Sequence, residues 1–453
     1  MTRRIRRIRA QDTPATPEIA ELNIVALDQG GSGLATVSAT APGHPADHEV
    51  PAVAPRSLPC PPPGQPGGPG DTRPINVTIT VPFTIPGERV RARVWRRQRG
   101  PDGADVSGAA DLLEVLAAAP DRVEPACPLF GTCGGCQLQH LAYPRQLDWK
   151  TTVVRELVAP LGLDHLVAPC VGSPRVFGYR SKITPHHDRP RAGESLAIGF
   201  LKVGRKHQVV DVPRCPLATD GINERLPELR AEIAATAPLG RLGASFLIRE
   251  ASSGVTTDPD ARVTERVGDL ELEFFAREFF QNNPFLLPRL VDFVVEAAAA
   301  GGAPVLVDTY TGSGLFALAA ARRFSSVVGV EVSPGAVRAA RDNAQRNNIT
   351  NARFVTSDAA RIFAEVTVSG DEAAVIVDPP RKGCGDAFLS QLAAFGPATI
   401  VYVSCNPETL ARDCDVLQRA GYQVEALQPF DMFPQTRHLE CVAVLKRPRT
   451  SSP

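Results

Sequence analysis

The sequence has no excess of either charge, because 49 Lys and Arg residues balance 49 Asp and Glu residues. Such a balance does not mark a nucleic-acid-binding protein, although local basic patches still bind phosphate. The chain also lacks an apolar run long enough to span a bilayer, since the longest one, residues 286–307, is interrupted by Arg289, Asp292 and Glu296. We therefore expect no membrane partner.

A secretory signal peptide is also missing ahead of the ten cysteines. A long chain of this kind is typical of a reducing compartment, so the sequence predicts a cytoplasmic protein. There, clustered cysteines are more often metal ligands or catalysts than disulfides. The first ten residues carry five arginines and no acid, which fits an RNA-contacting arm or, in a eukaryote, a mitochondrial presequence.

The 453 residues are enough for two or three domains. Short strands with glycine turns near the amino terminus predict a five-stranded OB-like barrel, with a generic β-meander as the alternative. We expect a basic flexible tail at 1–18, the barrel at 19–98 with a disordered Pro/Gly-rich insertion at 39–74, a linker with one short helix at 99–126, a mixed α+β central domain at 127–275 and a C-terminal domain at 276–453.

Helical segments and continuous apolar strands alternate in the C-terminal domain. This alternation predicts an α/β fold with a Rossmann-like, doubly wound parallel sheet. The expected strands are Pro304–Asp308, Ser326–Val332, Arg353–Thr356, Ala373–Val377, Thr399–Val403 and Gln423–Gln428.

A glycine turn containing Gly312 and Gly314 follows the first of these strands. Glycine lets the backbone approach a ligand, and Glu331 at the end of the second strand is placed to accept ribose hydroxyls. The third glycine of a dinucleotide fingerprint is absent, which favours an adenosyl group without a pyrophosphate. Asp358 after the third strand is an adenine contact or a helix cap. A plain α/β turn with a surface acid is the alternative for the whole pattern.

Three reactive side chains also stand at strand ends: Asp378, Cys405 and Glu440. Asn406 is expected to cap the helix after Cys405, with Pro407 in its first turn. A thiol at a helix amino terminus is expected to have a lowered pKa, which makes Cys405 a candidate nucleophile. The alternative is an unreactive cysteine buried in the core.

Methylation of uracil at carbon 5 is a reaction that needs both a nucleophile such as Cys405 and a base such as Glu440. Carbon 5 is too weak a nucleophile to accept a sulfonium methyl group unaided, and addition of a thiolate at carbon 6 activates it. A base, for which Glu440 is the candidate, then removes the proton from carbon 5. Asp378 is a candidate for orienting the uracil or the cofactor, and a base within folded RNA has to be flipped out.

Together these segments resemble the RNA (uracil-5-)-methyltransferase family. The matching pieces are GGSGLATV, IPGERVRARV, CPLFGTCGGCQLQH, GYRSK, CPLA, FFQNN, DTYTGSGLF, DPPRKG, VSCNP and HLECV. The resemblance implies S-adenosyl-L-methionine as cofactor, tRNA or rRNA as partner, and an RNA-binding TRAM domain formed by the barrel. It further implies that Cys405 is the nucleophile and Glu440 the base. Cofactor positions are implied for Gln281, Tyr310, Glu331 and Asp378.

Cys127, Cys133 and Cys136 form a C-x5-C-x2-C pattern, and Cys215 is a distant fourth cysteine. Four thiolates suit an iron–sulfur cluster or zinc, and spacing alone does not choose between them. The family resemblance implies a [4Fe–4S] cluster at these four positions.

Tyr179, Arg180 and Lys182 are candidates for contact with RNA phosphate, or simply a solvated strand end. We expect the chain to act as a monomer. An RNA cytosine-5 methyltransferase is one alternative, but DPPRKG lacks the cysteine expected there. Another alternative is an amino-group methyltransferase, which would need neither Cys405 nor Glu440. A third is a catalytically inactive RNA-binding protein, but this sequence has both the nucleophile and the base positions filled.

Overall fold

The computed structural model describes residues 17–39, 75–99, 105–188, 196–236, 245–357, 362–363 and 366–448. Asp358, nearly all of the expected basic tail and nearly all of the expected insertion lie outside these ranges. The chain divides into two compact units, Met1–Arg122 and Val123–Pro453. Within the described ranges, every helix falls short of the length and apolar character that crossing a membrane requires.

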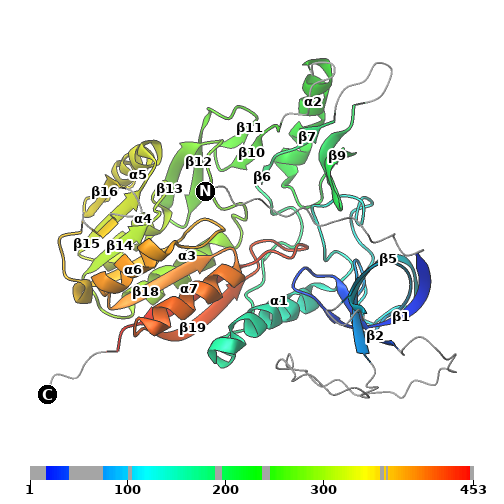
Figure 1. The fold of residues 1–453 in the computed structure, drawn as a ribbon. Helices are drawn as coiled ribbons and strands as arrows, with labels where there is room; N and C mark the ends of the chain where they lie inside the picture. Colours follow the sequence, from blue (N-terminus) through cyan, green and yellow to red (C-terminus); the bar gives the residue numbers. More distant parts are fainter. Residues whose placement is uncertain are drawn as a thin grey trace, which may run out of the picture. The chain divides into compact units, whose positions relative to one another are not determined.

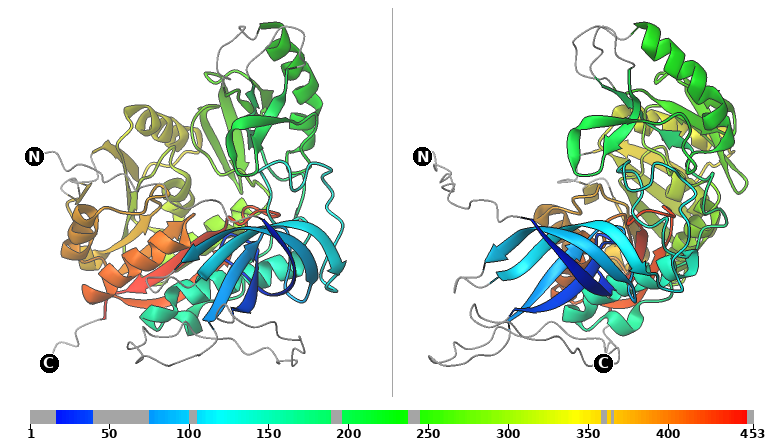
Figure 2. Two further views of the ribbon diagram at one scale, coloured as in Figure 1. Left: turned by 45° about the vertical axis from the view of Figure 1, so that its right-hand side comes forward. Right: turned by 90° about the vertical axis from the view of Figure 1, so that its right-hand side faces the viewer.

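The first unit is a closed five-stranded barrel with the strand order β1-β2-β3-β5-β4, drawn in blue to cyan in Figure 2. Alternate residues of its strands, such as Leu22 and Ile24, point into a shared apolar core. The barrel is the OB-like architecture that the glycine-turn pattern predicts. Its strands are β1 (Glu18–Leu27), β2 (Gly33–Ala39), β3 (Ile75–Val81), β4 (Arg89–Arg99) and β5 (Asp105–Ala117).

Strand β5 corrects the expected linker with a short helix at 99–126. Residues Asp105–Ala117 pair antiparallel with β4 and parallel with β3, and so close the barrel. The segment is rich in Ala and Leu, which favour helix in isolation. Pairing on both sides outweighs that local preference, because strand formation depends mainly on neighbouring strands.

A buried ion pair lies at one end of the barrel. Glu88 is 1% exposed and accepts the backbone N–H of Ile85 at 2.9 Å. Its carboxylate also pairs with the guanidinium of Arg122, which donates to the carbonyl of Phe83 at 2.9 Å. The pair therefore links the last residue of this unit to the turn that precedes β4.

The second unit is built on a seven-stranded sheet with the order β16-β15-β14-β17-β18-β20-β19 (Figure 1). The predicted parallel alternation is confirmed for β14 to β18, whereas β20 runs antiparallel to both of its neighbours. The strands are β14 (Val305–Thr309), β15 (Ser326–Glu331), β16 (Ala352–Thr356), β17 (Ala373–Val377), β18 (Thr399–Ser404), β19 (Gln423–Phe430) and β20 (Glu440–Lys446).

Helices cover both faces of this sheet, so the sheet is doubly wound. Alternate strand residues enter two separate cores, as Leu306 and Val307 do. Helices α3, α4 and α5 pack on one face and α1, α6 and α7 on the other. Their bounds are α1 (Tyr143–Val158), α3 (Leu287–Ala299), α4 (Leu315–Ala320), α5 (Pro334–Arg346), α6 (Asp386–Phe395) and α7 (Pro407–Arg419).

The expected central domain does not stand wholly apart from this sheet. Val154 and Val158 of α1 enter the same core as α7, and Val167 bridges to Leu427 of β19. The remainder forms small sheets and one helix. These elements are β6 (Lys182–Ile183), β7 (His186–His187), β8 (Ile198–Lys202), β9 (Arg205–Asp211), α2 (Asp220–Thr236), β10 (Ile248–Ala251), β11 (Gly254–Thr256), β12 (Arg262–Val267) and β13 (Leu270–Phe275).

Candidate active site

Most of the predicted site residues lie at one edge of the large sheet. Strands β14, β15, β17 and β18 are parallel neighbours, so their carboxyl ends meet at that edge. Tyr310, Asp378 and Cys405 directly follow three of these strands, and Glu331 is the last residue of the fourth. Ligands of open parallel sheets bind at this edge, so the topology gathers the predicted residues where a cofactor cleft is expected.

The glycine turn after β14 is tied to the acid at the end of β15. Gly312 and Gly314 adopt positive φ angles of 55° and 95°, a region that favours glycine. The backbone N–H of Gly312 donates to Glu331 Oε2 at 3.2 Å, and that of Ser333 donates to Oε1 at 2.9 Å. The Glu331 carboxylate is therefore held at the mouth of the turn, where the sequence predicts contacts to ribose hydroxyls.

Asp308 in β14 is a buried acid at this turn that the sequence did not single out. Its carboxylate accepts the Thr311 hydroxyl at 2.6 Å and the backbone N–H of Ala317 at 2.9 Å. Burial, together with the charge of Glu331, raises the pKa of Asp308 to about 7. Its position at the start of DTYTGSG was a usable signal, since an acid before a glycine turn can fix both the turn and the following helix.

Cys405 stands directly before α7, as predicted. Asn406 caps this helix, because its side chain accepts the backbone N–H of Glu408 at 3.2 Å, and Pro407 occupies the first helical position. Ser404, the last residue of β18, pairs with Cys441 of β20. Cys405 and Glu440 are therefore the next residues outward on the two paired strands.

The expected lowering of the Cys405 pKa is wrong for this structure. Burial, together with the carboxylates of Glu440 and Asp378, raises the pKa of the thiol to about 11. These effects outweigh the positive charge of Arg381, which lowers the pKa. At neutral pH the thiol is therefore the favoured form.

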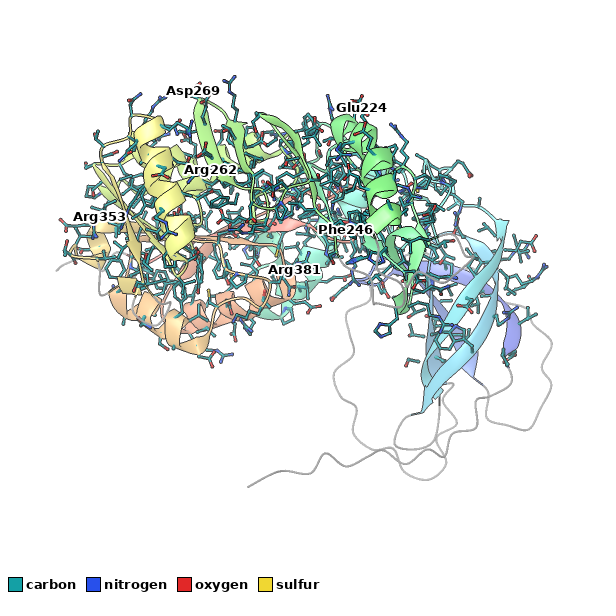
Figure 3. All side chains as sticks on the ribbon, turned by 90° about the horizontal axis from the view of Figure 1, so that it is seen from above. Glu224, Phe246, Arg262, Asp269, Arg353 and Arg381 are labelled. Carbon is teal, nitrogen blue, oxygen red and sulfur yellow. The ribbon has the colours of Figure 1, made fainter. Side chains whose placement is uncertain are left out.

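Arg381 is a second residue that the sequence did not single out (Figure 3). Its guanidinium lies near the Cys405 thiol, and its positive charge lowers the pKa of that thiol. The Asn406 side chain donates to the Arg381 carbonyl at 3.2 Å, which joins the loop after β17 to the turn that bears the cysteine. The cation in DPPRKG was visible in the sequence, but its distance from Cys405 was not.

Glu440 is 3% exposed, and its Oε2 atom has no hydrogen-bond partner among the described residues. Burial raises the pKa of this carboxyl well above its ordinary value, the nearby Asp378 raises it further, and Arg381 opposes both. Burial together with the charge of Asp308 raises the pKa of Asp378 to about 7. Perturbed carboxyls of this kind gather at catalytic sites, because neutral forms permit proton exchange near pH 7.

Gln281 lies in the segment between β13 and α3 and is 5% exposed. The neighbouring Asn283 donates to Ser173 Oγ at 3.0 Å and to the Met432 carbonyl at 3.3 Å, so the segment is anchored on two sides. The cofactor role of Gln281 remains a prediction.

The candidate phosphate contacts separate into two groups. Tyr179 is 0% exposed and donates its hydroxyl to the Pro434 carbonyl at 3.0 Å, so contact with RNA phosphate is the wrong interpretation for this residue. Arg180 and Lys182 are half-buried. Lys182 donates to the carbonyls of Arg277 and Glu278, and burial lowers its pKa to about 8.

The four cysteines predicted to bind a metal come from segments that meet in the fold. Each of Cys133, Cys136 and Cys215 has a raised pKa, caused first by burial and then by neighbouring thiols of the same set, including Cys127. Gln139 donates to Cys136 Sγ at 3.2 Å and accepts the backbone N–H of Cys127 at 3.0 Å. Among the described residues, however, no group of three or more side chains has the arrangement of a metal site.

Known proteins are similar to this chain in both sequence and fold. Residues 261–448 match the family model described as tRNA (Uracil-5-)-methyltransferase. A tRNA (uracil(54)-C(5))-methyltransferase of Schizosaccharomyces pombe is 39% identical over 82% of this chain and 73% of its own length. The chain belongs to the RNA (uracil-5-)-methyltransferase family.

Two further members show the breadth of this RNA (uracil-5-)-methyltransferase family. A 23S rRNA (uracil(1939)-C(5))-methyltransferase of Alkalilimnicola ehrlichii is 34% identical, covering 82% of this chain and 92% of the relative. The solved Pyrococcus abyssi tRNA (uracil-54, C5)-methyltransferase, in complex with S-adenosyl-L-homocysteine, is 25% identical with a TM-score of 0.64. That match covers 94% of this chain and 100% of the other. The family resemblance predicted from the motifs is confirmed.

Proposed function

We propose that this chain transfers a methyl group from S-adenosyl-L-methionine to carbon 5 of a uridine in RNA, through a covalent bond from Cys405 to carbon 6. The observation that carries the mechanism is the meeting of Cys405 and Glu440 at the ends of the paired strands β18 and β20. A thiol and a buried carboxyl at one site supply the two functions that this reaction needs, a nucleophile and a base.

The residues act in a fixed order. The Cys405 thiolate bonds to carbon 6 of the uracil, which makes carbon 5 nucleophilic enough to take the methyl group that S-adenosyl-L-methionine supplies. Glu440 as carboxylate then removes the proton from carbon 5, the electron pair re-forms the double bond between carbons 5 and 6, and the thiolate leaves. Each turnover therefore returns Cys405 to its starting state.

Arg381 and Asp378 are proposed to set the protonation states for this sequence. The guanidinium of Arg381 offsets part of the negative charge that develops on sulfur, since its positive charge already lowers the pKa of the thiol. Asp378, with a pKa of about 7, is able to accept a proton from the thiol or to hydrogen-bond the uracil. Glu331 and the Gly312 turn would hold the cofactor, because they offer a carboxylate and positive-φ backbone at the strand ends.

The RNA is proposed to be a tRNA or an rRNA, as the names of the relatives state for those proteins. The uridine has to leave its stack to reach a half-buried thiol. Unmodified tRNA transcripts and rRNA fragments, each assayed for transfer of labelled methyl groups, will separate the two substrates.

The mechanism is tested with RNA that carries 5-fluorouridine. Fluorine replaces the proton that Glu440 would remove, so the Cys405 adduct should persist and migrate as a protein–RNA band on a denaturing gel. Cys405→Ala should form no such band and should transfer no methyl group. Cys414→Ala, at a buried cysteine of α7, is the matched control and should keep both activities. A fully active Cys405→Ala enzyme would refute the mechanism.

We also propose that Cys127, Cys133, Cys136 and Cys215 hold a [4Fe–4S] cluster. Support comes from the donor set itself, four cysteines from segments that meet in the fold, with Gln139 donating to Cys136 Sγ and accepting the backbone N–H of Cys127. Iron and acid-labile sulfide should each be present at about four per chain in protein purified without oxygen. One zinc per chain with no iron would replace the cluster by a zinc site. The absence of both iron and zinc would refute the proposal.

A further inference from the structure

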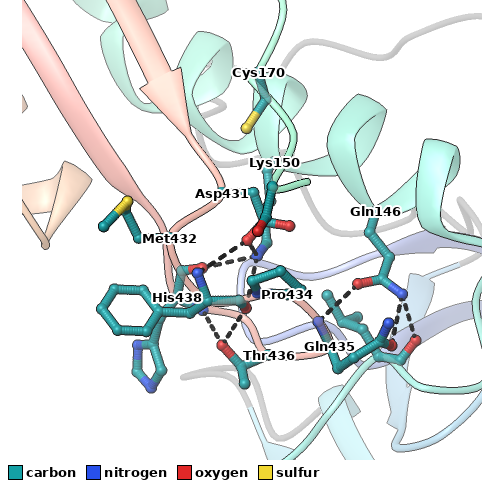
Figure 4. Close-up of polar contacts among 12 residues, drawn as sticks. Gln146, Lys150, Cys170, Asp431, Met432, Pro434, Gln435, Thr436 and His438 are labelled. Atoms are coloured by element: carbon teal, nitrogen blue, oxygen red, sulfur yellow. Dashed lines mark hydrogen bonds and ion pairs between the residues drawn. The ribbon is translucent and has the colours of Figure 1, made fainter. Parts of the chain in front are cut away.

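A buried lysine of α1 binds both ends of the loop that leads to Glu440. The loop between β19 and β20, residues 431–439, is hereafter the base loop. Lys150 is 0% exposed, and its Nζ lies 2.5 Å from Asp431 Oδ1, in the first residue of this loop. The same nitrogen donates to the carbonyl of Phe433 at 3.2 Å and to that of His438, the last residue but one, at 2.8 Å (Figure 4).

The centre of the base loop is held by a pair of buried amides. Gln146, one turn before Lys150 on α1, donates to Gln435 Oε1 at 2.9 Å and accepts the Gln435 backbone N–H at 3.0 Å. Gln435 has a positive φ of 68°, an angle that non-glycine residues seldom adopt. Its carbonyl accepts the backbone N–H groups of Gln137 and Leu138, both at 3.1 Å.

A buried ion pair contributes little more to folding than apolar side chains of the same size would, because removing two charges from water is costly. The particular property of Lys150 is geometric, since one nitrogen fixes both ends of the base loop at once. The second end lies only two residues from Glu440.

We propose that Lys150 is a positioning residue for Glu440, acting through the base loop. The Glu440 carboxyl has one oxygen without a partner among the described residues, so its direction depends on the backbone that carries it. Cys405 follows β18 and lies outside the loop that Lys150 holds. Lys150 therefore acts on removal of the carbon 5 proton and not on attack by the thiolate, an inference that rests on the proposed function.

The test is the double variant Lys150→Met/Asp431→Asn, which removes the clamp without leaving an unpaired buried charge. Tyr422→Phe is the matched control. It deletes one buried hydrogen bond, from the phenol to the Pro397 carbonyl at 3.1 Å, at the opposite end of β18 and β19. Both proteins are compared with wild type in single turnovers on an unmodified RNA substrate, with melting temperatures measured in parallel.

In the double variant we expect methyl transfer into the protein–RNA adduct to stay within about twofold of wild type. Release of methylated RNA should slow by about tenfold to a hundredfold, because small misplacements of a reacting group have effects of that size. Michaelis constants for RNA and cofactor should change by less than about twofold. Tyr422→Phe should lower the melting temperature yet leave both rates unchanged.

Two results would overturn this inference. One is a folded double variant that releases product at the wild-type rate. The other is an equal slowing of transfer and release, which would assign Lys150 a general structural role. Failure of the proposed function looks different, because wild-type protein would then form no adduct with 5-fluorouridine RNA.

Discussion

Cys405 and Glu440 are the residues next to the last pair of the β18–β20 ladder, which is Ser404 with Cys441. The nucleophile and the base thus come from two strands that hydrogen-bond each other, although 35 positions separate them in the chain. The ladder brings the backbones of the two groups to one place, which favours accurate placement of reacting side chains.

Replacement of the base should trap the reaction midway. In Glu440→Gln the amide keeps the shape of the carboxyl but accepts no proton, so release of methylated RNA should slow by about a hundredfold to ten-thousandfold. Adduct should therefore accumulate on ordinary uridine RNA, detectable on a denaturing gel. Glu425→Gln, an exposed position on β19, serves as control. Normal turnover by Glu440→Gln would assign the proton transfer to another group.

Arg381 should control the reactivity of the thiol. With a pKa of about 11, the thiolate fraction of Cys405 rises with pH through neutrality, and so should its alkylation by iodoacetamide. Arg381→Met removes a charge that lowers this pKa, so the pKa should rise and the alkylation profile should move to higher pH. If the pKa rises by about one, the thiolate fraction and the alkylation rate at neutral pH fall by about tenfold.

The matched control for Arg381 is Lys382→Met, which removes an exposed neighbouring cation. Mass spectrometry of the Cys405 peptide measures the rate at each pH. If the alkylation profile of Cys405 moves as far in Lys382→Met as in Arg381→Met, the shift reflects the overall charge of the site. It would then not depend on the position of Arg381 beside the sulfur.

Cofactor affinity should depend on Glu331. A charged hydrogen bond contributes about 1.5–3 kcal/mol, so Glu331→Gln should bind S-adenosyl-L-homocysteine roughly ten- to a hundredfold more weakly. The substitution also weakens the acceptor for the Gly312 and Ser333 amides. Isothermal titration calorimetry gives the affinity directly. Unchanged binding would remove Glu331 from the cofactor site.

The barrel should lose stability when its buried pair is broken. Arg122→Met leaves the Glu88 carboxylate buried and unpaired, which costs about 3 kcal/mol or more. Urea unfolding, followed by circular dichroism, should show the loss. Arg89→Met breaks only an exposed pair with Glu21 and should change stability by less than about 1 kcal/mol. Equal effects of the two substitutions would contradict the structural argument.

Strand ends were the most predictable part of the site. Parallel topology places Tyr310, Glu331, Asp378 and Cys405 at one edge, and apolar alternation alone predicts that topology. The pKa of Cys405 was predicted in the wrong direction, because sequence shows the helix terminus but neither the burial nor the carboxylates around the thiol.

Long-range contacts explain the other differences. Strand β5 has a helix-like composition, and only its pairing with β3 and β4 makes it a strand. Lys150 meets Asp431 across 281 positions, a distance over which no local pattern gives a signal. Asp308 was missed for a simpler reason, since an acid inside an apolar strand looks incidental until its bonds to Thr311 and Ala317 are seen.

The reversed direction of β20 has a practical consequence. Its first residue, Glu440, lies at the reactive edge, so its last residue, Lys446, lies at the opposite edge, paired with Thr399 at the start of β18. A label or affinity tag joined after this strand therefore begins a full strand length away from the thiol. Surface attachment through such a tag should leave the reactive edge free for single-molecule measurements of adduct lifetime.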